Sequence, residues 1–324
     1  MRGAGGTLPR GYADLNVYTR IIVDEARVRG IAVDIFDPAR GGLALTHGGR
    51  TVRTLESLSE LTSAVAFRIC DDKGQTREVL ERAGIAVPPG RLATFDDADL
   101  DFLAEHRDVV VKPVRGEQGW GVTVGVTSPG ELDRARTEAS RWCPDVLLER
   151  RCPGDDVRVV VIADEVVAAS VRRPAQVVGT GSHTIAELVE EESRAREAAT
   201  GGASTIPLDQ MTRDVVASAG YCLDDVLENG VTLAVRRTAN LHTGGTIHDI
   251  TDELHPALAA TAVEVAQVIG IPVVGVDLVV HGFDSPDHVV IEANEQPGLA
   301  NHEPRPTAAR FIDLLFPETA GSSL

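Results

Sequence analysis

The chain has 324 residues, of which 31 are basic and 49 acidic, so its formal net charge is −18. A surface that binds nucleic acid needs a basic footprint, and this composition therefore argues against DNA or RNA as a partner. Hydrophobic residues make up 43% of the chain and aromatic residues only 4%. We expect about two or three domains with cores built mainly from aliphatic side chains.

No segment approaches the roughly 20 consecutive apolar residues that a membrane-spanning helix needs. The glycine-rich segment 1–10 lacks the apolar centre of a signal peptide. The four cysteines are scattered without a CxxC pair, so the sequence predicts neither a zinc site nor a disulfide framework. We therefore expect a cytoplasmic protein with reduced thiols and no membrane partner.

The first third of the chain predicts a small α/β region followed by a strong helix. Its expected elements are, in order, a helix over 15–29, a strand over 31–37, a strand from Leu43, a tight turn at 47–50, a returning strand over 51–55 and a helix over 71–83. The turn is glycine-rich, which favours a hairpin. Gly84 follows the last helix, as is typical of a helix C-terminus.

The rest of the chain predicts strands and helices in mixed order. Its expected elements are strands over 109–114, 145–150, 157–162, 166–171, 233–237, 272–280 and 288–293, and helices over 129–142, 184–196, 256–269 and 307–315. The strands 157–162 and 166–171 should form an antiparallel pair, and the polar segment 197–206 is expected to be a mobile loop. This order favours an α+β fold with a cleft between two antiparallel-sheet domains.

A lysine stands at the end of an apolar strand, just before a glycine-rich loop. Lys112 follows three valines, and the loop contains Gly116, Gly119 and Gly121. Glycines accept positive φ and let backbone N–H groups approach an anion, and the lysine adds a charge beside them. The pattern indicates a polyphosphate cradle, with a plain hairpin turn and a surface lysine as the alternative. It is not a P-loop, because no GK[ST] sequence follows.

A second pattern follows the strand 145–150. Glu149 leads into the turn Arg151-Cys152-Pro153-Gly154-Asp155-Asp156. A nucleobase slot needs an acceptor for an exocyclic amine, backbone groups for the ring edge and a carboxylate for the ribose. Glu149, the Arg151–Cys152 backbone and Asp156 suit these roles, and a solvated acidic turn is the alternative.

The strongest pattern lies near the end of the chain. Asp277 stands inside a valine-rich strand, where an acid is costly to bury unless it is paired or binds a metal. Glu292 and Asn294 are two residues apart, so their side chains share one face of the next strand. If the strands pair, three oxygen ligands converge in a way that suits magnesium and leaves room for phosphate and water. An outward-facing acidic edge is the alternative.

These features, in this order, resemble the ATP-grasp superfamily of carboxylate–amine ligases over about residues 71–317. Lys73 fits the earlier of the two ATP-binding lysines. The segments RRTANLHTGG (236–245) and DITDELHP (249–256) are similar to the cyanophycin synthetase branch. Together with EANEQPGLANHEP (292–304), they give a nearest likeness to N-acetylglutaminylglutamine synthetases.

The resemblance implies an α+β ATP-grasp fold in which two α/β subdomains with antiparallel sheets clasp ATP. Its expected parts are a small N-terminal α/β cap over 1–68, N-terminal and lid subdomains over 69–160, a C-terminal catalytic subdomain over 161–317 and a tail over 318–324. The glycine loop and the segment 197–206 would act as lids that exclude water.

The implied reaction forms an amide bond through an acyl phosphate and releases ADP, with ATP and one or two Mg²⁺ or Mn²⁺ ions. ATP-binding residues would be Lys73, Lys112, Gly116, Gly119, Gly121, Glu149, Arg151, Cys152 and Asp156, and metal ligands Asp277, Glu292 and Asn294. Catalytic residues would be Arg158, which steers the phosphate, and the oxyanion-stabilising Arg237, Asn240, Gly244 and Gly245. Asn301 and His302 would line the acceptor pocket, with a structural role as the alternative for His302.

An acylated glutamine or a short glutamine peptide is the expected substrate, and small carboxylates and amines are the expected partners. The resemblance leaves a homodimer open. Related proteins often carry an N-terminal acetyltransferase-like domain, for which this sequence has no room, so an acetylated donor would come from another enzyme. The alternatives are another peptide ligase of the cyanophycin or glutathione type, a small-molecule kinase, and a nucleotide-binding module without catalysis.

Overall fold

The computed structural model describes residues 8–116, 119–200, 202, 204–239, 241–302 and 304–321. The chain forms two compact units. Unit 1 comprises residues 1–91, 152–170 and 249–324, and unit 2 comprises residues 92–151 and 171–248. Each unit is built from segments far apart in the sequence, and the linear domain boundaries expected from the sequence stay predictions.

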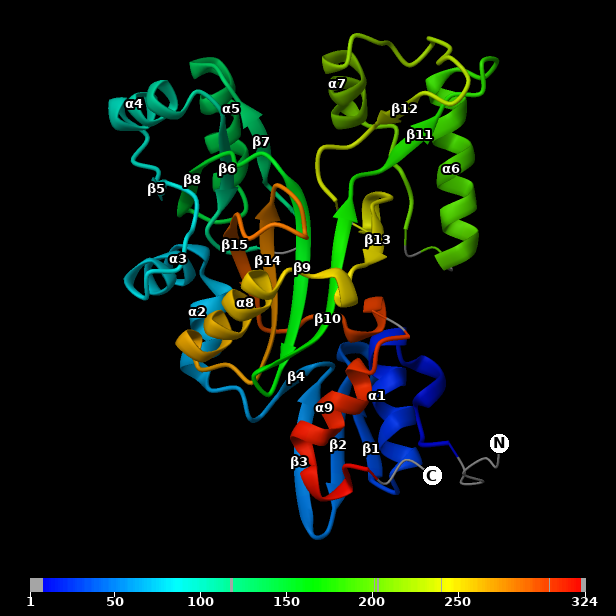
Figure 1. Ribbon diagram of the computed structural model, residues 1–324. Coiled ribbons are helices and arrows are strands. Elements are labelled where there is room, and N and C mark those ends of the chain that lie inside the picture. Colours follow the sequence, from blue (N-terminus) through cyan, green and yellow to red (C-terminus); the bar gives the residue numbers. More distant parts are fainter. Residues whose placement is uncertain are drawn as a thin grey trace. The chain divides into compact units, whose positions relative to one another are not determined.

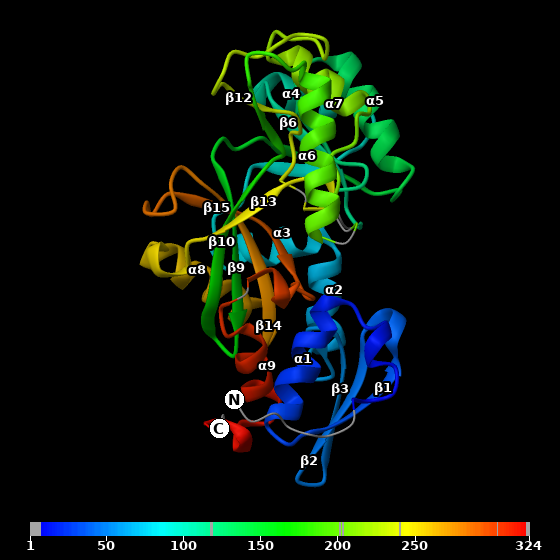
Figure 2. The same cartoon turned by 90° about the vertical axis from the view of Figure 1, so that its right-hand side faces the viewer.

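Unit 1 begins with a helix and an antiparallel sheet. Its elements are α1 (Val17–Val28), β1 (Ala32–Asp37), β2 (Gly42–His47), β3 (Arg50–Leu55) and β4 (Leu58–Ser59), and the sheet order is β1-β2-β3-β4. The C-terminal helix α9 (Thr307–Leu315) lies beside α1, and both belong to this part of the unit (Figures 1 and 2). Leu43, Leu45, Phe311 and Phe316 are completely buried in their common core.

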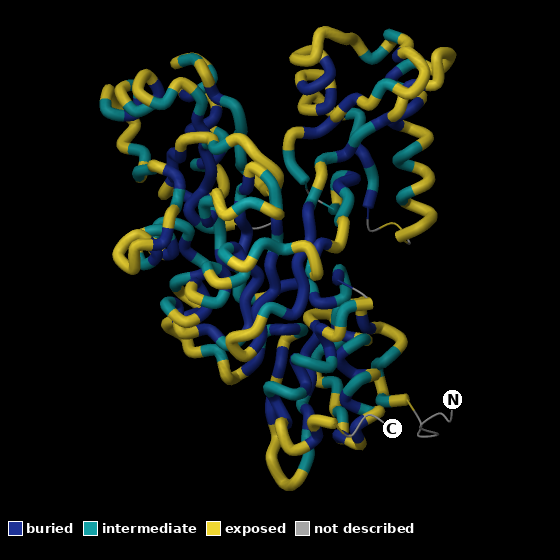
Figure 3. Tube along the Cα trace, viewed as in Figure 1, coloured by how far each residue is buried: buried dark blue, intermediate teal, exposed yellow. Residues whose placement is uncertain are grey.

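A five-stranded sheet includes the unit 1 strands 155–162, 273–280 and 288–294, while residues 171–173 and 246–248 of its other two strands belong to unit 2. Its order is β13 (Thr246–Asp249), β10 (Glu165–Arg173), β9 (Asp155–Ile162), β14 (Val273–Val280) and β15 (His288–Asn294). Helix α8 (Pro256–Ile269) packs on β9 and β14, and helices α2 (Ala64–Asp71) and α3 (Lys73–Arg82) pack on β15. Strands β9 and β14 are valine-rich and buried along most of their length, as the dark strands of Figure 3 show.

Unit 2 contains two smaller sheets with their own helices. The first sheet, in the order β5-β8-β6-β7, comprises β5 (Gly90–Leu92), β8 (Val146–Arg150), β6 (Val109–Pro113) and β7 (Thr123–Val126), with helices α4 (Asp97–His106) and α5 (Pro129–Ser140). The second pairs β11 (Gln176–Val178) with β12 (Thr232–Ala234), beside helices α6 (Ile185–Thr200) and α7 (Gln210–Ser218). Each sheet has its own apolar cluster.

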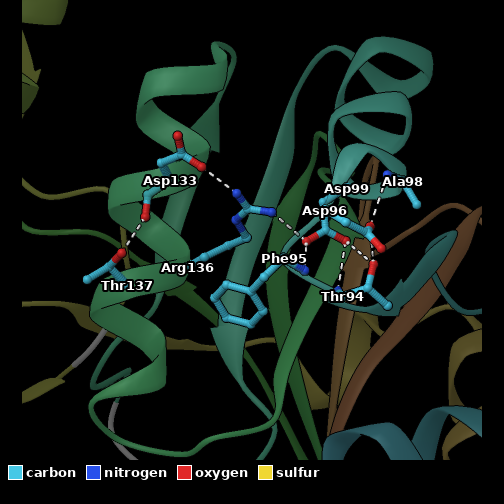
Figure 4. Close-up of polar contacts among 8 residues, drawn as sticks. All are labelled: Thr94, Phe95, Asp96, Ala98, Asp99, Asp133, Arg136 and Thr137. Atoms are coloured by element: carbon cyan, nitrogen blue, oxygen red, sulfur yellow. Dashed lines mark hydrogen bonds and ion pairs between the residues drawn. The ribbon is translucent and has the colours of Figure 1, made fainter.

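Helices α4 and α5 are joined by a buried ion pair. Nη1 of Arg136 donates to Asp99 Oδ2 at 2.7 Å, and Arg136 also contacts Asp133 (Figure 4). Asp99 is completely buried and accepts the backbone N–H groups of Thr94 and Phe95. Burial would raise the pKa of Asp99, but these hydrogen bonds and the Arg136 charge outweigh burial and lower it.

Most of the elements predicted from the sequence are confirmed. Helix α8 has the predicted bounds, and Gly270 caps it with φ of +71°. Strands β9 and β10 are neighbours in the sheet, joined by Ala163 and Asp164 with positive φ, as in a tight hairpin. Helices α2, α4 and α7 and strands β4, β5, β7, β11 and β13 were not predicted.

Three predictions of local structure are wrong. The expected helix 71–83 is broken at Asp72, because the carboxylate of Asp72 accepts the N–H of Gln75 and starts α3 as a new helix. The expected strand 233–237 stops at Ala234, and the next two residues are buried. The segment 197–206 is helical as far as Thr200, and Ser204 and Ile206 are buried.

Within the part of the chain that the structure describes, no helix has the length and apolarity needed to cross a membrane.

Candidate active site

Unit 1 brings the three predicted metal ligands together. Asp277 on β14 lies directly opposite Glu292 on β15, and Gly275 lies opposite Asn294. In antiparallel strands, directly opposed side chains share a face and have Cβ atoms about 4.5–5.5 Å apart. The Asn294 Nδ2 lies 3.4 Å from Asp277 Oδ2. The prediction that the two strands pair, on which the metal site depends, is confirmed.

A bulge in β15 aligns these groups. The register shifts between Asp277 and Leu278, so that Leu278 lies opposite Val290 and Ile291 is the extra residue. Val290 and Ala293 are three residues apart and both are buried. In a regular strand, side chains three residues apart point to opposite faces of the sheet. The bulge therefore lets β15 bury two apolar side chains and still present Glu292 beside Asp277.

Strand β9 adds an arginine from the other side of β14. Arg158 lies opposite Asp277, and its Nε and Nη2 atoms each donate to one carboxylate oxygen at 2.7 Å. Asp277 is 4% exposed, so this bidentate pair satisfies a buried charge. Asp156 stands two residues before Arg158 on the same strand face.

The polar site begins where an apolar face ends. Val160 and Val273 belong to the core that packs against α1 and α9. Val160 lies on the same face of β9 as Arg158, and Val273 lies on the same face of β14 as Asp277. Gly275 lies between, and a Cβ there would come within 3.1 Å of Pro297. The glycine therefore allows the 297 segment to approach the strand beside the carboxylates.

Lys73 reaches the same set of residues from α3. It is the first residue of that helix, directly after the Asp72 cap, and its Nζ lies 3.0 Å from Glu292 Oε1. Nearby Cys70 is buried, and burial, with the charges of Glu295 and Glu292, raises its pKa to about 12. The thiol therefore stays protonated, and we assign it no role as a nucleophile or ligand.

The donor set fits a hard divalent cation. Asp277, Glu292 and Asn294 offer carboxylate and amide oxygens, which Mg²⁺ and Mn²⁺ prefer. Among the described residues, no group of three or more His, Cys, Asp or Glu side chains has the geometry of a metal site. Two carboxylates and one amide would leave the remaining coordination positions to phosphate oxygens and water.

Unit 2 holds the second predicted lysine. Lys112 on β6 and Glu149 on β8 share a sheet face, and Lys112 Nζ lies 2.6 Å from Glu149 Oε2. Each residue is only 5% exposed. The sequence predicted phosphate binding for Lys112 and base recognition for Glu149, and the ion pair between them was not foreseen.

The glycine loop after β6 has the expected backbone. Gly116, Gly119 and Gly121 have φ of +142°, +76° and +71°, which favours glycine at each position. A Cβ on Gly121 would come within 2.6 Å of Trp142, whose ring lies 4.9 Å from that of Trp120. Glu117 and Gln118 of this loop lie outside the described residues.

The turn after β8 is divided between the units. The Arg151 N–H donates to the carbonyl of Asp108 at 3.0 Å, and its guanidinium lies 3.1 Å from the Asp108 carboxylate. The backbone N–H expected to face a nucleobase edge is therefore used within unit 2. Cys152 and Asp156 belong to unit 1.

The predicted oxyanion residues lie in unit 2. The Arg237 Nη1 donates to the Val124 carbonyl at 2.7 Å. The Gly244 N–H donates to Leu241 within a turn, and a Cβ on Gly244 would come within 2.4 Å of Ile206. Gly244 therefore serves packing, and its N–H is engaged. Asn240 lies outside the described residues, and Gly245, whose carbonyl accepts from Arg196, is buried.

The predicted acceptor residues rest on the N-terminal part of unit 1. Asn301 and buried His302 form a 3-10 helix, Leu299–His302, and Tyr18 Oη donates to Asn301 Oδ1 at 3.1 Å. Ser57 Oγ donates to the Pro297 carbonyl, and Glu56 accepts from Gln296. No local sequence pattern predicts these supports, because the contacting residues are more than 200 positions apart along the chain.

Two acids of the segment 249–252, which belongs to a motif of the family resemblance, bind Arg305, a residue that follows the 299–302 turn. Arg305 Nε lies 2.5 Å from Asp249, and two further nitrogens contact Asp252. Burial would raise the pKa of Asp249, but hydrogen bonds from Arg305 and Thr251 outweigh burial and lower it. The Arg305 hydrogen bond also lowers the pKa of Asp252. The motif therefore anchors the chain just after His302.

Comparison with known proteins identifies the family. A profile of the ATP-grasp domain matches residues 70–298, which is more than two thirds of the chain. The chain therefore belongs to the ATP-grasp family.

The relatives include cyanophycin synthetases and glutathione enzymes. The chain is 34% identical to cyanophycin synthetase of Geminocystis herdmanii, over 97% of this chain and 38% of that one. It is 29% identical to a bifunctional glutathione biosynthesis protein of Clostridium perfringens, over 94% and 42%. The chain thus spans about two fifths of these relatives' length.

Solved structures agree with this placement. A bifunctional glutathione synthetase from Pasteurella multocida matches with a TM-score of 0.68 and 27% identity, over 95% of this chain and 45% of that one. A D-alanine–D-alanine ligase from Bacillus anthracis has a TM-score of 0.50 at 15% identity, over 81% and 71%, and supports the fold alone. The likeness to N-acetylglutaminylglutamine synthetases stays a prediction.

Proposed function

We propose that this chain is an ATP-dependent carboxylate–amine ligase that forms an amide bond through an acyl phosphate. The observation that carries the proposal is the set on one face of unit 1: Asp277 opposite Glu292, with Asn294, Arg158 and Lys73 in contact. Phosphoryl transfer requires positioning and neutralisation of charge, which this set of oxygen donors and cations is suited to supply.

The first step transfers the γ-phosphoryl group. The substrate carboxylate attacks the γ-phosphorus, the bond to the β-phosphate oxygen breaks, and ADP leaves. Lys73 and Lys112 neutralise phosphate oxygens, and Arg158 steers the transferred group. A divalent ion held by Asp277, Glu292 and Asn294 would neutralise charge on the β- and γ-phosphate oxygens.

The second step forms the amide. The amine nitrogen attacks the acyl carbon, loses a proton and expels inorganic phosphate. Arg237 and the Gly245 region are the candidates to stabilise the oxyanion, and losing one such donor costs about 10²–10³ in rate. Asn301 and His302 line the acceptor pocket in this proposal. ATP with Mg²⁺, one or two ions, or Mn²⁺ is the expected cofactor set.

We propose an acylated glutamine or a glutamine dipeptide as the carboxylate substrate, in keeping with the 292–304 segment. The cyanophycin and glutathione relatives make other amino-acid or peptide pairs the main alternative. A panel of carboxylates and amines with Mg-ATP, read by product mass and ADP release, separates these substrates. A homodimer and a cytoplasmic location belong to the same proposal.

Oxygen transfer tests the chemistry. With an ¹⁸O-labelled carboxylate substrate, the inorganic phosphate released should carry one ¹⁸O atom. A kinase would instead yield ADP and a stable phosphorylated product without any amine. Release of AMP and pyrophosphate would exclude the mechanism.

Two variants test the residues. Glu292→Gln and Lys112→Ala should each reduce ADP release by at least about 10². Glu264→Gln, at an exposed position of α8, is the matched control and should retain full activity. Near wild-type rates in either site variant would contradict the assignment.

A further inference from the structure

Each carboxylate that is proposed to bind the metal already forms an ion pair with a basic side chain of the protein. Arg158 donates one hydrogen bond of 2.7 Å to each oxygen of Asp277. Lys73 Nζ lies 3.0 Å from Glu292 Oε1. The proposed reaction assigns different partners to these side chains, because it makes the carboxylates metal ligands and the cations phosphate ligands.

The backbone enforces both pairs. Arg158 and Asp277 are opposite each other in the β9–β14 ladder, so their side chains meet without any movement of the strands. Lys73 is fixed at the start of α3 by the Asp72 cap. The pairs are therefore the resting arrangement of this face, and not chance contacts of long surface side chains.

Burial makes the pairs matter for cation affinity. The side chains of Asp277 and Arg158 are 6% and 20% exposed, and those of Lys73 and Glu292 are 10% and 27% exposed. Charges so poorly screened by water interact several times more strongly than surface charges. A divalent ion approaching Asp277 and Glu292 therefore meets two protein cations that repel it and occupy the oxygens it needs.

We propose that Lys73 and Arg158 are resident counter-ions that keep this carboxylate pair in a low-affinity state for divalent cations until nucleotide binds. The phosphate oxygens of the nucleotide then replace the carboxylates as partners of Lys73 and Arg158. Asp277 and Glu292 thereby become available to the metal. The exchange breaks no covalent bond, and each charged group keeps a partner of opposite sign throughout. This inference rests on the proposed function and adds to it an order: metal is bound with nucleotide, and not before it.

Binding of Mn²⁺ to the whole chain without nucleotide tests the inference, read by electron paramagnetic resonance of the free ion. Arg158→Gln keeps an amide donor for Asp277 but removes the charge, and Lys73→Gln does the same for Glu292. We expect each variant to bind Mn²⁺ at least tenfold more tightly than the unmodified chain. Adding Asp277→Asn to Arg158→Gln should abolish the gain.

Arg310→Gln is the matched control, because it removes an arginine from an exposed ion pair with Glu165 on the surface of the same unit. It should leave the affinity unchanged. Thermal melts check that the variants are folded, and they add a readout of their own: Mn²⁺ should raise the Tm of Arg158→Gln but not that of the unmodified chain. Lys73→Gln provides an independent test if the loss of the arginine prevents folding.

The outcomes separate this inference from the proposed function. If both folded variants bind Mn²⁺ no better than the unmodified chain, the counter-ion role is wrong. Because an ATP analogue binds Mn²⁺ by itself, the unmodified chain with a non-hydrolysable analogue should bind more Mn²⁺ than the analogue alone, and Asp277→Asn should remove that excess. If this binding is absent, the metal site of the proposed function is itself wrong. Tight Mn²⁺ binding to the unmodified chain without nucleotide would also overturn the inference.

Discussion

Lys112 and Glu149 form an ion pair of 2.6 Å inside unit 2, and each residue is 5% exposed. They stand on neighbouring strands, β6 and β8, in a sheet whose register brings their side chains to one face. A lysine assigned to phosphate binding is thus also one half of a buried pair. Its substitution should affect stability as well as turnover, and the two effects can be separated.

Lys112→Met should lower the free energy of unfolding by about 3–5 kcal/mol, because it leaves Glu149 as a buried charge without this partner. The double variant Lys112→Met/Glu149→Leu should recover most of that loss, since neither charge remains to be buried. Both proteins should be inactive. Urea unfolding of the two variants measures the difference, and equal midpoints for them would contradict the structural role of the pair.

The Asp99–Arg136 pair of Figure 4 should make stability depend on acid pH. Folding lowers the pKa of Asp99 from its ordinary value of 3.8. The stabilisation is therefore fully present above about pH 4 and is lost as the pH falls through the lower, folded pKa. Asp99→Asn should be less stable than the unmodified chain by about 3–5 kcal/mol at pH 6.

The stability difference between Asp99→Asn and the unmodified chain should shrink only below about pH 4. Chemical unfolding at several pH values between 6 and 3 measures it. A difference that already declines between pH 6 and pH 5 would show that another group controls the effect.

Tyr18→Phe should impair use of the amino-acid or peptide substrate and spare ATP. The variant removes the hydroxyl that donates to Asn301, at a cost of about 1 kcal/mol, or roughly fivefold. We expect the KM of the acceptor substrate to rise by about that factor, with KM for ATP and kcat nearly unchanged. Tyr12→Phe, which removes a surface hydroxyl bound to Asp24, is the matched control. A rise in KM for ATP alone would argue against an acceptor role for the 299–302 turn.

Gly244→Ala should destabilise unit 2 far more than Gly119→Ala. Both glycines have similar positive φ, +86° and +76°, so the backbone cost of a side chain is similar, about 1–2 kcal/mol. At Gly244 the new Cβ would also lie 2.4 Å from the side chain of buried Ile206, whereas a Cβ at Gly119 would have no atom of the described residues within 4 Å apart from its chain neighbours. We expect an additional loss of about 1–3 kcal/mol at Gly244, measured by urea unfolding. Equal losses of stability in the two variants would mean that the side chains around Ile206 shift to accept the new methyl group at no further cost.

Sequence patterns predicted the elements with strong local signals. The helix 256–269 begins at a proline and ends before a glycine, and the strands around Asp277 and Glu292 are runs of valine bounded by turns, so local chemistry sets their limits. Asp72 was misread because a carboxylate suits both a helix N-cap and an exposed helical position. Helix α4 was missed, since its acidic sequence has little apolar periodicity.

By itself the sequence determined which residues have the chemistry for a nucleotide and a metal: the acids in valine-rich strands, the lysines and the glycine loop. Only the tertiary structure decided their partners. Arg158 meets Asp277, Lys73 meets Glu292, and Tyr18 meets Asn301 across gaps of 119, 219 and 283 residues. Such pairings follow from strand register and helix docking, which minimise exposed apolar surface over the whole chain, and no local pattern records them.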